Sequence, residues 1–349
     1  MPRTRLLLVD DSALFIEALT TWLASEPDID IVGVARDGRE AIDMAQRLMP
    51  DIIMMDVLMP VMDGLEAIER IMASRPTPIL VMTSDPRGES GELSIEALAR
   101  GALDLVQKPL SLPISAAQRR ALVDKLKFLA SVSVVRHIRG HRHRWRRDGS
   151  APPVAEETKE TRLVAIVAST GGPSALAQIL GALPFDFGAA VLVVQHMGAA
   201  FAEAFCAWLD HASALEVRLA QHGERPVPGL ALVAPPGRHM LLSSGGRIRL
   251  LAETRGEPHV PSADVLFRSL AAHAPRTTAV VLTGMGSDGA EGLLELRRAG
   301  AVTLVQDPAS SIVDGMPAAA RRAGAAREVL ALGEIAPALL RLCAKREGG

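Results

Sequence analysis

The sequence contains no tyrosine, and its few phenylalanines and tryptophans bring the aromatic content to only 3%. This scarcity weakens any case for a protein that stacks nucleic-acid bases on aromatic side chains. Acidic and basic residues nearly balance, with a formal net charge of -2, so no overall field favours DNA, RNA or an anionic membrane. We therefore predict that the chain does not bind nucleic acid.

Cysteines and long apolar runs are also scarce. Cys206 and Cys343 have neither the spacing of metal ligands nor the pairing of a disulfide framework, and they fit a reducing cytoplasm. No apolar run approaches the roughly 20 residues that cross a bilayer, and the first residues do not read as a signal peptide. We expect a cytoplasmic protein without membrane insertion, and nothing demands more than a monomer.

Short apolar segments that alternate with amphipathic stretches are abundant, which is the pattern of α/β proteins with parallel sheets. Five such segments precede residue 131: 5–9, 31–35, 51–55, 78–82 and 103–106. Five more follow residue 160: 163–168, 190–195, 231–234, 278–283 and 301–306. We predict two doubly wound, mainly parallel α/β domains, at residues 1–130 and 161–349.

Residues 131–160 break the alternation and are predicted to form a linker. They contain a basic stretch, Arg136–Arg147, followed by a segment rich in proline, alanine and glutamate. A nucleic-acid-binding regulator could use such a stretch, but a charge run between domains is usually a solvated linker. It could equally pair with an acidic receptor or with an acidic face of the first domain.

Polar residues lie where the predicted strands of the first domain end. Asp10 and Asp11 end the first strand, Asp56 the third, Thr83 the fourth and Lys108 the fifth. Strand ends share one edge of a parallel sheet, so the three carboxylates should cluster there and bind Mg²⁺. Asp56 is the predicted phosphoryl acceptor, with Lys108 neutralising charge and Thr83 binding the phosphate. Each aspartate alone could instead be a cap or turn former.

The first domain resembles the receiver domain of two-component response regulators over residues 3–130. The matching motifs are Val9–Ser12, Met55–Gly64, Thr83–Ser84 and Lys108–Pro109. The resemblance implies a flavodoxin-like fold with a five-stranded parallel sheet and a histidine kinase of the CheA type as phosphodonor. It also implies a cis peptide before Pro109.

Three groups suited to acyl transfer follow strands of the second domain: Ser169, His196 and Asp288. Such chemistry needs an activated hydroxyl, a base that takes its proton and a carboxylate that orients the base. We predict these three roles for Ser169, His196 and Asp288 respectively. Their order along the chain, and the absence of a Gly-x-Ser-x-Gly elbow, match none of the common serine hydrolases.

Simpler explanations exist for single residues of this set. Ser169 could merely cap the helix that begins near Pro173. His196 could be a core histidine whose ring nitrogens are satisfied.

A different function is suggested by the glycines around Asp288. Gly284, Gly286 and Gly289 form a G-x-G-x-x-G sequence after a strand, and Asp307 lies about 20 residues beyond, as in a dinucleotide-binding fold. This alternative explains neither the serine nor the histidine, and it places the fingerprint late in its domain.

Residues 162–345 resemble the catalytic domain of the chemotaxis protein-glutamate methylesterases, the CheB family. The matching segments are 168–172, 194–197, 234–240, 261–267, 282–289 and 315–317. The resemblance implies hydrolysis of glutamyl methyl esters on cytoplasmic helices of chemoreceptors, release of methanol, and often deamidation of receptor glutamines. It implies that the Met285 backbone amide helps hold the oxyanion, that Thr170 lies in the active-site motif, and that this domain needs no cofactor.

Four positions depart from the family pattern. Val167 stands in place of glycine, Gly198–Ala200 in place of a proline-containing loop, Val260 in place of arginine and Asp314 in place of an aromatic residue. None removes a member of the triad, but an exchanged charge near the crevice would change receptor docking.

The fusion of the two domains suggests regulation. The resemblance implies that the unphosphorylated receiver covers the active-site mouth and that phosphorylation at Asp56 relieves this block. A regulatory protein whose esterase domain has lost its activity is the remaining alternative.

Overall fold

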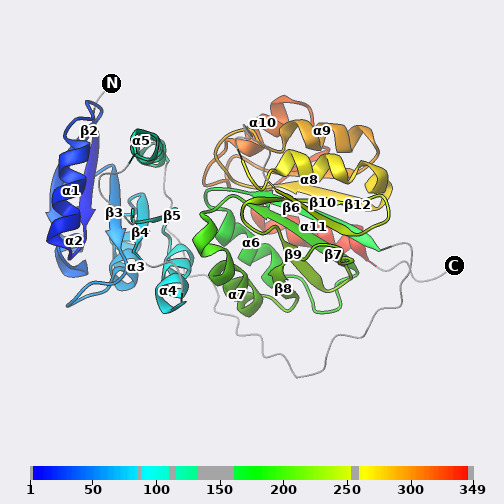
Figure 1. Ribbon diagram of the computed structural model, residues 1–349, viewed down its shortest axis with the longest axis horizontal. Coiled ribbons are helices and arrows are strands. Elements are labelled where there is room, and N and C mark those ends of the chain that lie inside the picture. The colour runs from blue at the N-terminus through cyan, green and yellow to red at the C-terminus, as the bar shows by residue number, and fades with distance from the viewer. Residues whose placement is uncertain (1–2, 85–87, 110–114, 133–160, 253–258, 345–349) are drawn as a thin grey trace. The chain divides into compact units, whose positions relative to one another are not determined.

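The structure is a computed structural model that describes residues 3–84, 88–109, 115–132, 161–252 and 259–344. The chain divides into two compact units, residues 1–141 and 142–349. Each unit contains one parallel sheet with helices around it (Figure 1). The predicted linker, including its basic stretch, lies outside the described residues except for positions 131 and 132.

The N-terminal unit contains a five-stranded parallel sheet in the order β2-β1-β3-β4-β5. Strands and helices alternate strictly along the chain: β1 (Thr4–Val9), α1 (Ala13–Leu23), β2 (Ile29–Ala35), α2 (Gly38–Leu48), β3 (Ile52–Asp56), α3 (Gly64–Ser74), β4 (Ile79–Thr83), α4 (Gly88–Ala99), β5 (Asp104–Gln107) and α5 (Ala116–Ala130). The predicted five-stranded doubly wound fold is confirmed.

Side-chain caps begin several of these helices. Asp37 accepts hydrogen bonds from the backbone N–H groups of residues 39 and 40 before α2, and Asp63 accepts one from residue 66 before α3. Ser115 and Gln118 form a capping box at the start of α5. Such caps satisfy N–H groups that have no partner inside the helix, so they fix where each helix begins.

The C-terminal unit is larger and contains a seven-stranded parallel sheet in the order β14-β13-β12-β6-β7-β9-β8. These strands are β6 (Arg162–Ala168), β7 (Ala189–Gln195), β8 (Glu216–Leu219), β9 (Leu230–Val233), β12 (Thr277–Val281), β13 (Val302–Gln306) and β14 (Glu328–Leu330). A separate antiparallel hairpin consists of β10 (Arg238–Leu242) and β11 (Ile248–Ala252). The predicted mainly parallel sheet is therefore confirmed.

Helices cover this sheet and bury its central strands. They are α6 (Gly172–Gly181), α7 (Ala202–Ala212), α8 (Ala263–Ser269), α9 (Ala290–Arg298), α10 (Met316–Arg322) and α11 (Leu332–Cys343), with short 3₁₀ turns at Ala199–Phe201 and Ala271–Arg276. Helices α6, α7 and α11 form one packed group, and α8, α9 and α10 form another (Figure 1). Every residue of β7 is buried, as expected for a parallel strand covered on both faces.

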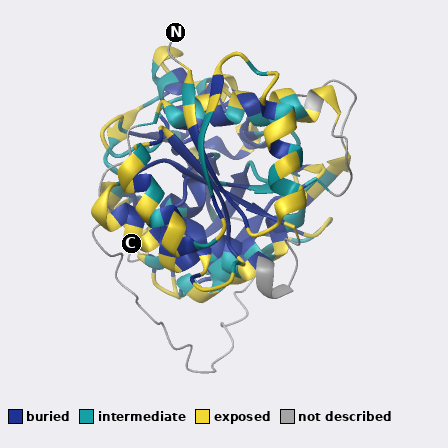
Figure 2. Ribbon diagram, turned by 90° about the vertical axis from the view of Figure 1, so that its left-hand side faces the viewer, coloured by how far each residue is buried: buried dark blue, intermediate teal, exposed yellow. Residues whose placement is uncertain are grey.

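The sheets therefore form the interior of each unit. In Figure 2 most of the central strands are dark blue, whereas exposed residues lie mainly on the outer faces of helices and in loops. No helix among the described residues is long and apolar enough to span a bilayer.

Four strands of the C-terminal unit were not predicted from the sequence: β8, β10, β11 and β14. Strand β14 has three residues and β8 has four, and both lie at sheet edges, where little burial is needed and the apolar signal is weak. The cis peptide expected before Pro109 is also wrong. Within the described residues the one cis peptide bond is Val260–Pro261.

Candidate active site

The three residues predicted for acyl transfer follow adjacent strands at the centre of the seven-stranded sheet. Strand β6 lies between β7 and β12, and Ser169, His196 and Asp288 follow these three strands in turn. The backbone N–H of Ser169 donates to Thr283 O at 3.1 Å, and that of His196 donates to Ala168 O at 3.0 Å. Backbone hydrogen bonds therefore continue past the ends of these strands. They join the segment Ala168–Ser169 to Thr283 on one side and to His196 on the other.

Ser169 does not cap the helix that follows it. The N-cap of α6 is Gly171, in the left-handed region at φ 76°, and no side chain caps this helix. A Cβ atom at Gly171 would also lie 2.9 Å from the Ile312 Cβ, so glycine fits on two grounds. The simple explanation of Ser169 as a helix cap is wrong.

His196 contacts Asp288 directly. Its Nε2 lies 2.9 Å from Asp288 Oδ2, and the side chains are 12% and 7% exposed respectively. An imidazole that donates from Nε2 has its lone pair on Nδ1. That Nδ1 is buried and has no hydrogen-bond partner within the described residues, Ser169 included.

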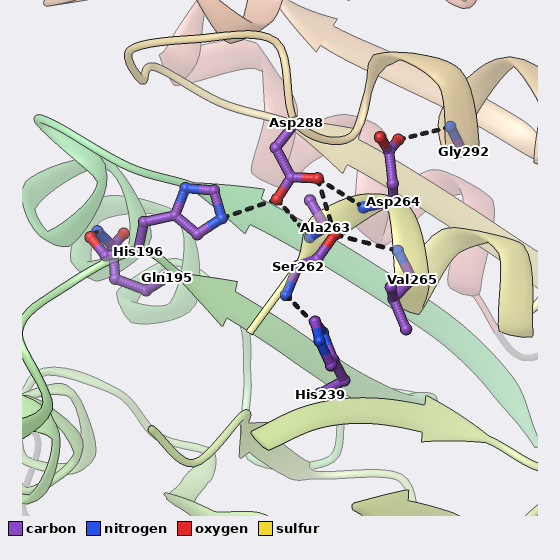
Figure 3. A network of polar contacts seen from close by, with 9 residues as sticks. All are labelled: Gln195, His196, His239, Ser262, Ala263, Asp264, Val265, Asp288 and Gly292. Carbon is purple, nitrogen blue, oxygen red and sulfur yellow. Dashed lines mark hydrogen bonds and ion pairs between the residues drawn. The ribbon is translucent and has the colours of Figure 1, made fainter. Parts of the chain in front are cut away.

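The carboxylate of Asp288 is held by the start of α8 (Figure 3). Its Oδ1 accepts hydrogen bonds from Ser262 Oγ at 2.9 Å and Asp264 N at 3.0 Å, and its Oδ2 accepts one from Ala263 N at 2.7 Å. Burial alone would raise the pKa of Asp288, but the hydrogen bonds from His196, Ala263 and Asp264 together lower that pKa to about 2. The group is therefore a fixed anion that faces one edge of the imidazole.

Gln195 is a site residue that the sequence reasoning missed. It is 5% exposed, and its Nε2 donates to Ser169 O at 2.8 Å and to His196 O at 2.9 Å. One amide group therefore joins the backbone beside the serine to the backbone beside the histidine. A buried polar residue at the end of the apolar strand β7 was the available signal.

The glycine-rich loop after β12 packs against Ser169. A Cβ atom at Gly284 would lie 2.7 Å from the Ser169 Cβ, so a glycine is needed for this approach. The neighbouring Met285 is 41% exposed, and Thr170 is buried with its carbonyl oxygen accepting from Thr283 Oγ1 at 3.0 Å. Thr170 is therefore the neighbour of Ser169 in the sequence, and Met285 follows the glycine that packs against Ser169 from the loop after β12.

The dinucleotide-binding alternative loses its main support here. Gly284 is explained by its approach to Ser169, and Gly289 has φ 91° at the start of α9. The Asp307 carboxylate accepts from the N–H and the hydroxyl of Ser310, so it closes a local turn.

The N-terminal unit has its own polar cluster at the strand ends. Carboxylate oxygens of Asp10, Asp11 and Asp56 all lie within 4.8 Å of one another. Asp56 Oδ1 accepts from the N–H groups of Val57 at 2.7 Å and Leu58 at 3.3 Å. Three oxygen donors at this separation suit a hard divalent cation such as Mg²⁺.

Lys108 lies within this cluster. Its Nζ is 2.5 Å from Asp10 Oδ2 and 2.6 Å from Asp56 Oδ2. Burial lowers the pKa of Lys108, but the contacts with Asp10 and Asp56 outweigh burial and raise it. Burial also raises the pKa of Asp10, against the opposing effect of Lys108. Thr83 is 3% exposed at the end of β4, and its carbonyl accepts from Lys108 N at 2.7 Å.

Comparison with known families agrees with these two sites. The CheB methylesterase family matches residues 164–339, and the response regulator receiver domain matches residues 6–114. The chain belongs to the CheB methylesterase family. The family match contains all three strand-end residues of the C-terminal unit, and the receiver match contains the acidic cluster.

Relatives cover nearly the whole chain. A protein-glutamate methylesterase/protein-glutamine glutaminase of Cupriavidus metallidurans is 44% identical over 97% of this chain and 98% of that protein. One from Pseudomonas fluorescens is 42% identical over 98% of this chain and 100% of that protein. The crystal structure of the Thermotoga maritima CheB methylesterase catalytic domain is 33% identical, with a TM-score of 0.50, and covers 52% of this chain and 98% of that one.

Proposed function

We propose that this protein is a phosphorylation-activated methylesterase that hydrolyses glutamyl methyl esters on the cytoplasmic helices of chemoreceptors and deamidates receptor glutamines. The His196–Asp288 contact at 2.9 Å carries the proposal, since it supplies an oriented base beside Ser169. The full-length relatives bear both activities in their names.

The proposed reaction has two steps. The Ser169 hydroxyl attacks the ester carbonyl, and its proton passes to His196 Nδ1, the ring nitrogen not engaged by Asp288. The bond to methoxide breaks, methanol leaves with the proton from His196, and an acyl-serine remains. Water then attacks this ester with His196 again acting as base, which releases the glutamate and restores Ser169. With a glutamine substrate the same steps release ammonia.

The remaining residues serve this path. Asp288 stabilises the imidazolium that forms when His196 takes the proton. The backbone amide of Met285 is assigned to the oxyanion, as in the family that the chain resembles, and Thr170 lies in the same motif.

The N-terminal unit is proposed to regulate this chemistry. Asp56 accepts a phosphoryl group from a histidine kinase of the CheA type, and Thr83 and Lys108 bind the phosphate. Mg²⁺ held by Asp10, Asp11 and Asp56 would neutralise charge on the transferring oxygens. The unphosphorylated N-terminal unit blocks the mouth of the active site, and phosphorylation removes this block. Such a switch requires that the blocked and open states differ in free energy by only a few kcal/mol. We expect a cytoplasmic monomer.

Methanol release from methylated receptor membranes tests this proposal. We expect release by the purified full chain, a rise on addition of acetyl phosphate and Mg²⁺, loss of release in Ser169→Ala, and loss of the rise alone in Asp56→Asn. The same membranes treated with an active family member serve as the control for substrate quality.

The alternatives give different outcomes in the same experiment. No release from membranes that the control enzyme demethylates would indicate a regulatory protein without esterase activity. Binding of NAD in a calorimetric titration would revive the dinucleotide-binding alternative, and a salt-dependent shift of DNA would support a nucleic-acid-binding linker.

A further inference from the structure

A second histidine lies flat against the proposed base. The ring centroids of His196 and His259 are 4.6 Å apart, and the ring planes differ by 10°. His259 comes from the segment that precedes α8, far along the chain from β7. It is half-buried, and the proposed mechanism gives it no role.

The segment that contains His259 also binds Asp288, the partner of His196. Ser262, Ala263 and Asp264 donate three hydrogen bonds to the two oxygens of Asp288. Residues 259–264 therefore contact the face of the His196 ring and donate to both oxygens of the Asp288 carboxylate, including Oδ2, which contacts His196. One short segment fixes both partners of the 2.9 Å contact.

We propose that His259 is a positioning residue for the esterase reaction: its neutral ring covers one face of His196 and holds that ring in line with Asp288. The proposal rests on the proposed function, because it assumes that His196 is the base. When His196 becomes an imidazolium, the π-face of a neutral ring is a favourable neighbour, whereas a second cation would oppose the proton transfer.

The surroundings keep His259 neutral. Burial, and then the positive charge that His196 acquires, lower the pKa of His259, while Asp288 acts in the opposite direction. Among the described residues, two other titratable groups contact this segment or its partner: the Asp264 N–H donates to Asp288, and His239 Nδ1 on β10 accepts from Ser262 N. Because burial and His196 lower the pKa of His259 from its usual value, its ring is neutral at neutral pH.

Substitutions at His259 separate stacking from simple filling of space. In the full chain with acetyl phosphate and Mg²⁺, we expect His259→Phe to keep kcat within about threefold, because a flat ring remains. We expect His259→Leu, of similar size but without a flat face, and His259→Ala to lower kcat roughly ten- to hundredfold with little change in KM, since misplacing a catalytic group by about 1 Å costs up to that much. His211→Ala on α7, whose ring bonds to its own helix at Ala207 O, is the control and should match the wild type.

The pH profile adds a signature that packing alone does not give. His259→Lys places a fixed positive charge on the face of His196, which disfavours protonation of that ring. The acidic limb of the kcat/KM profile should move to lower pH, because the base stays unprotonated further into acid, while the plateau falls because the imidazolium of the transition state is destabilised.

A nuclear magnetic resonance titration of the histidine side chains makes the inference independent of turnover. The His196 signals, assigned with His196→Gln, should titrate at lower pH in His259→Lys than in the wild type, and unfolding curves should show that each variant is folded. If the wild type releases methanol but the Leu, Ala and Lys variants match it in kcat and pH profile, the role of His259 is overturned while the proposed function stands. If no protein releases methanol yet the His196 titration moves as expected, the proposed function fails and the contact between the rings is upheld.

Discussion

At the scale of single residues, the site depends on how His196 divides its two ring nitrogens. Nε2 contacts Asp288, so Nδ1 is the nitrogen that remains for a proton from Ser169. The two carboxylate oxygens of Asp288 in turn accept from four donors: His196 and three groups at the start of α8. The tautomer of His196 is therefore fixed by hydrogen bonds that β6 and β7 do not make.

Asp288 should also give the stability of the protein a distinct pH dependence. Its pKa is about 2 in the folded chain, whereas an unperturbed aspartate has a pKa of 3.8. The anion therefore stabilises the fold fully above pH 3.8, and this contribution disappears as the pH falls toward 2. A lowering of that size is worth roughly 2 kcal/mol. In urea unfolding of the full chain, the difference between wild type and Asp288→Asn should shrink by about that amount between pH 5 and pH 2. A difference that stays constant over this range would contradict the assignment.

Gln195 should matter for both stability and turnover. Gln195→Met keeps the volume but removes the two N–H donors, so the carbonyl oxygens of Ser169 and His196 lose a buried partner. We expect a loss of about 1–3 kcal/mol in the free energy of unfolding, and a fall in kcat larger than any change in KM. Unfolding curves and methanol release measure the two effects. Unchanged turnover in a destabilised variant would show that Gln195 supports the fold alone.

At the scale of elements, the close packing of the start of α6 against the ends of β6 and β7 determines the geometry around Ser169. Gly172 is the first residue of this helix, and a Cβ atom there would lie 2.1 Å from Gln195 Oε1 and 2.7 Å from the Ala168 Cβ. The helix can therefore approach the ends of β6 and β7 only with glycine at this position. This approach also places Gly172 N 2.8 Å from Ser169 O.

Two glycine substitutions at helix starts should differ in their effects on stability. Gly172→Ala should destabilise the protein and lower turnover, because Gln195 must move and release Ser169 O and His196 O. Gly333→Ala in the first turn of α11 meets only the tip of Gln178, at 3.9 Å, and should be neutral or stabilise by about 0.5–1 kcal/mol. Thermal unfolding and methanol release compare the pair. Equal effects of the two substitutions would mean that the space at Gly172 is not limiting.

The sequence was informative about elements wherever burial was strong. The central strands of both sheets read as apolar runs, and the polar residues that end them mark both sites. The edge strands β8 and β14 were missed because short edge strands bury little, and the hairpin β10–β11 was missed although Gly245–Gly246 lies at its turn. Gln195 and His259 could not be assigned because their roles depend on contacts across the sheet and from a distant segment.

At the scale of the whole molecule, two complete α/β units each have a polar site at the strand ends of their own sheet. The acidic cluster belongs to the N-terminal unit, and the His196–Asp288 pair belongs to the C-terminal unit. The described residues that form each site come from one unit. Any coupling between them must then act through the equilibrium of the units rather than through shared catalytic groups.

This separation leads to a test by truncation. A chain of residues 161–349 retains the whole seven-stranded sheet and all three proposed catalytic residues, and the isolated catalytic domain from Thermotoga maritima crystallises as a folded unit. If the N-terminal unit inhibits, this fragment should release methanol faster than the unphosphorylated full chain and should not respond to acetyl phosphate. The full chain with Asp56→Asn should stay at the low rate under both conditions. A fragment that is folded, as judged by circular dichroism, yet no faster than the unphosphorylated full chain would exclude inhibition, and phosphorylation would then have to act by recruiting the receptor substrate.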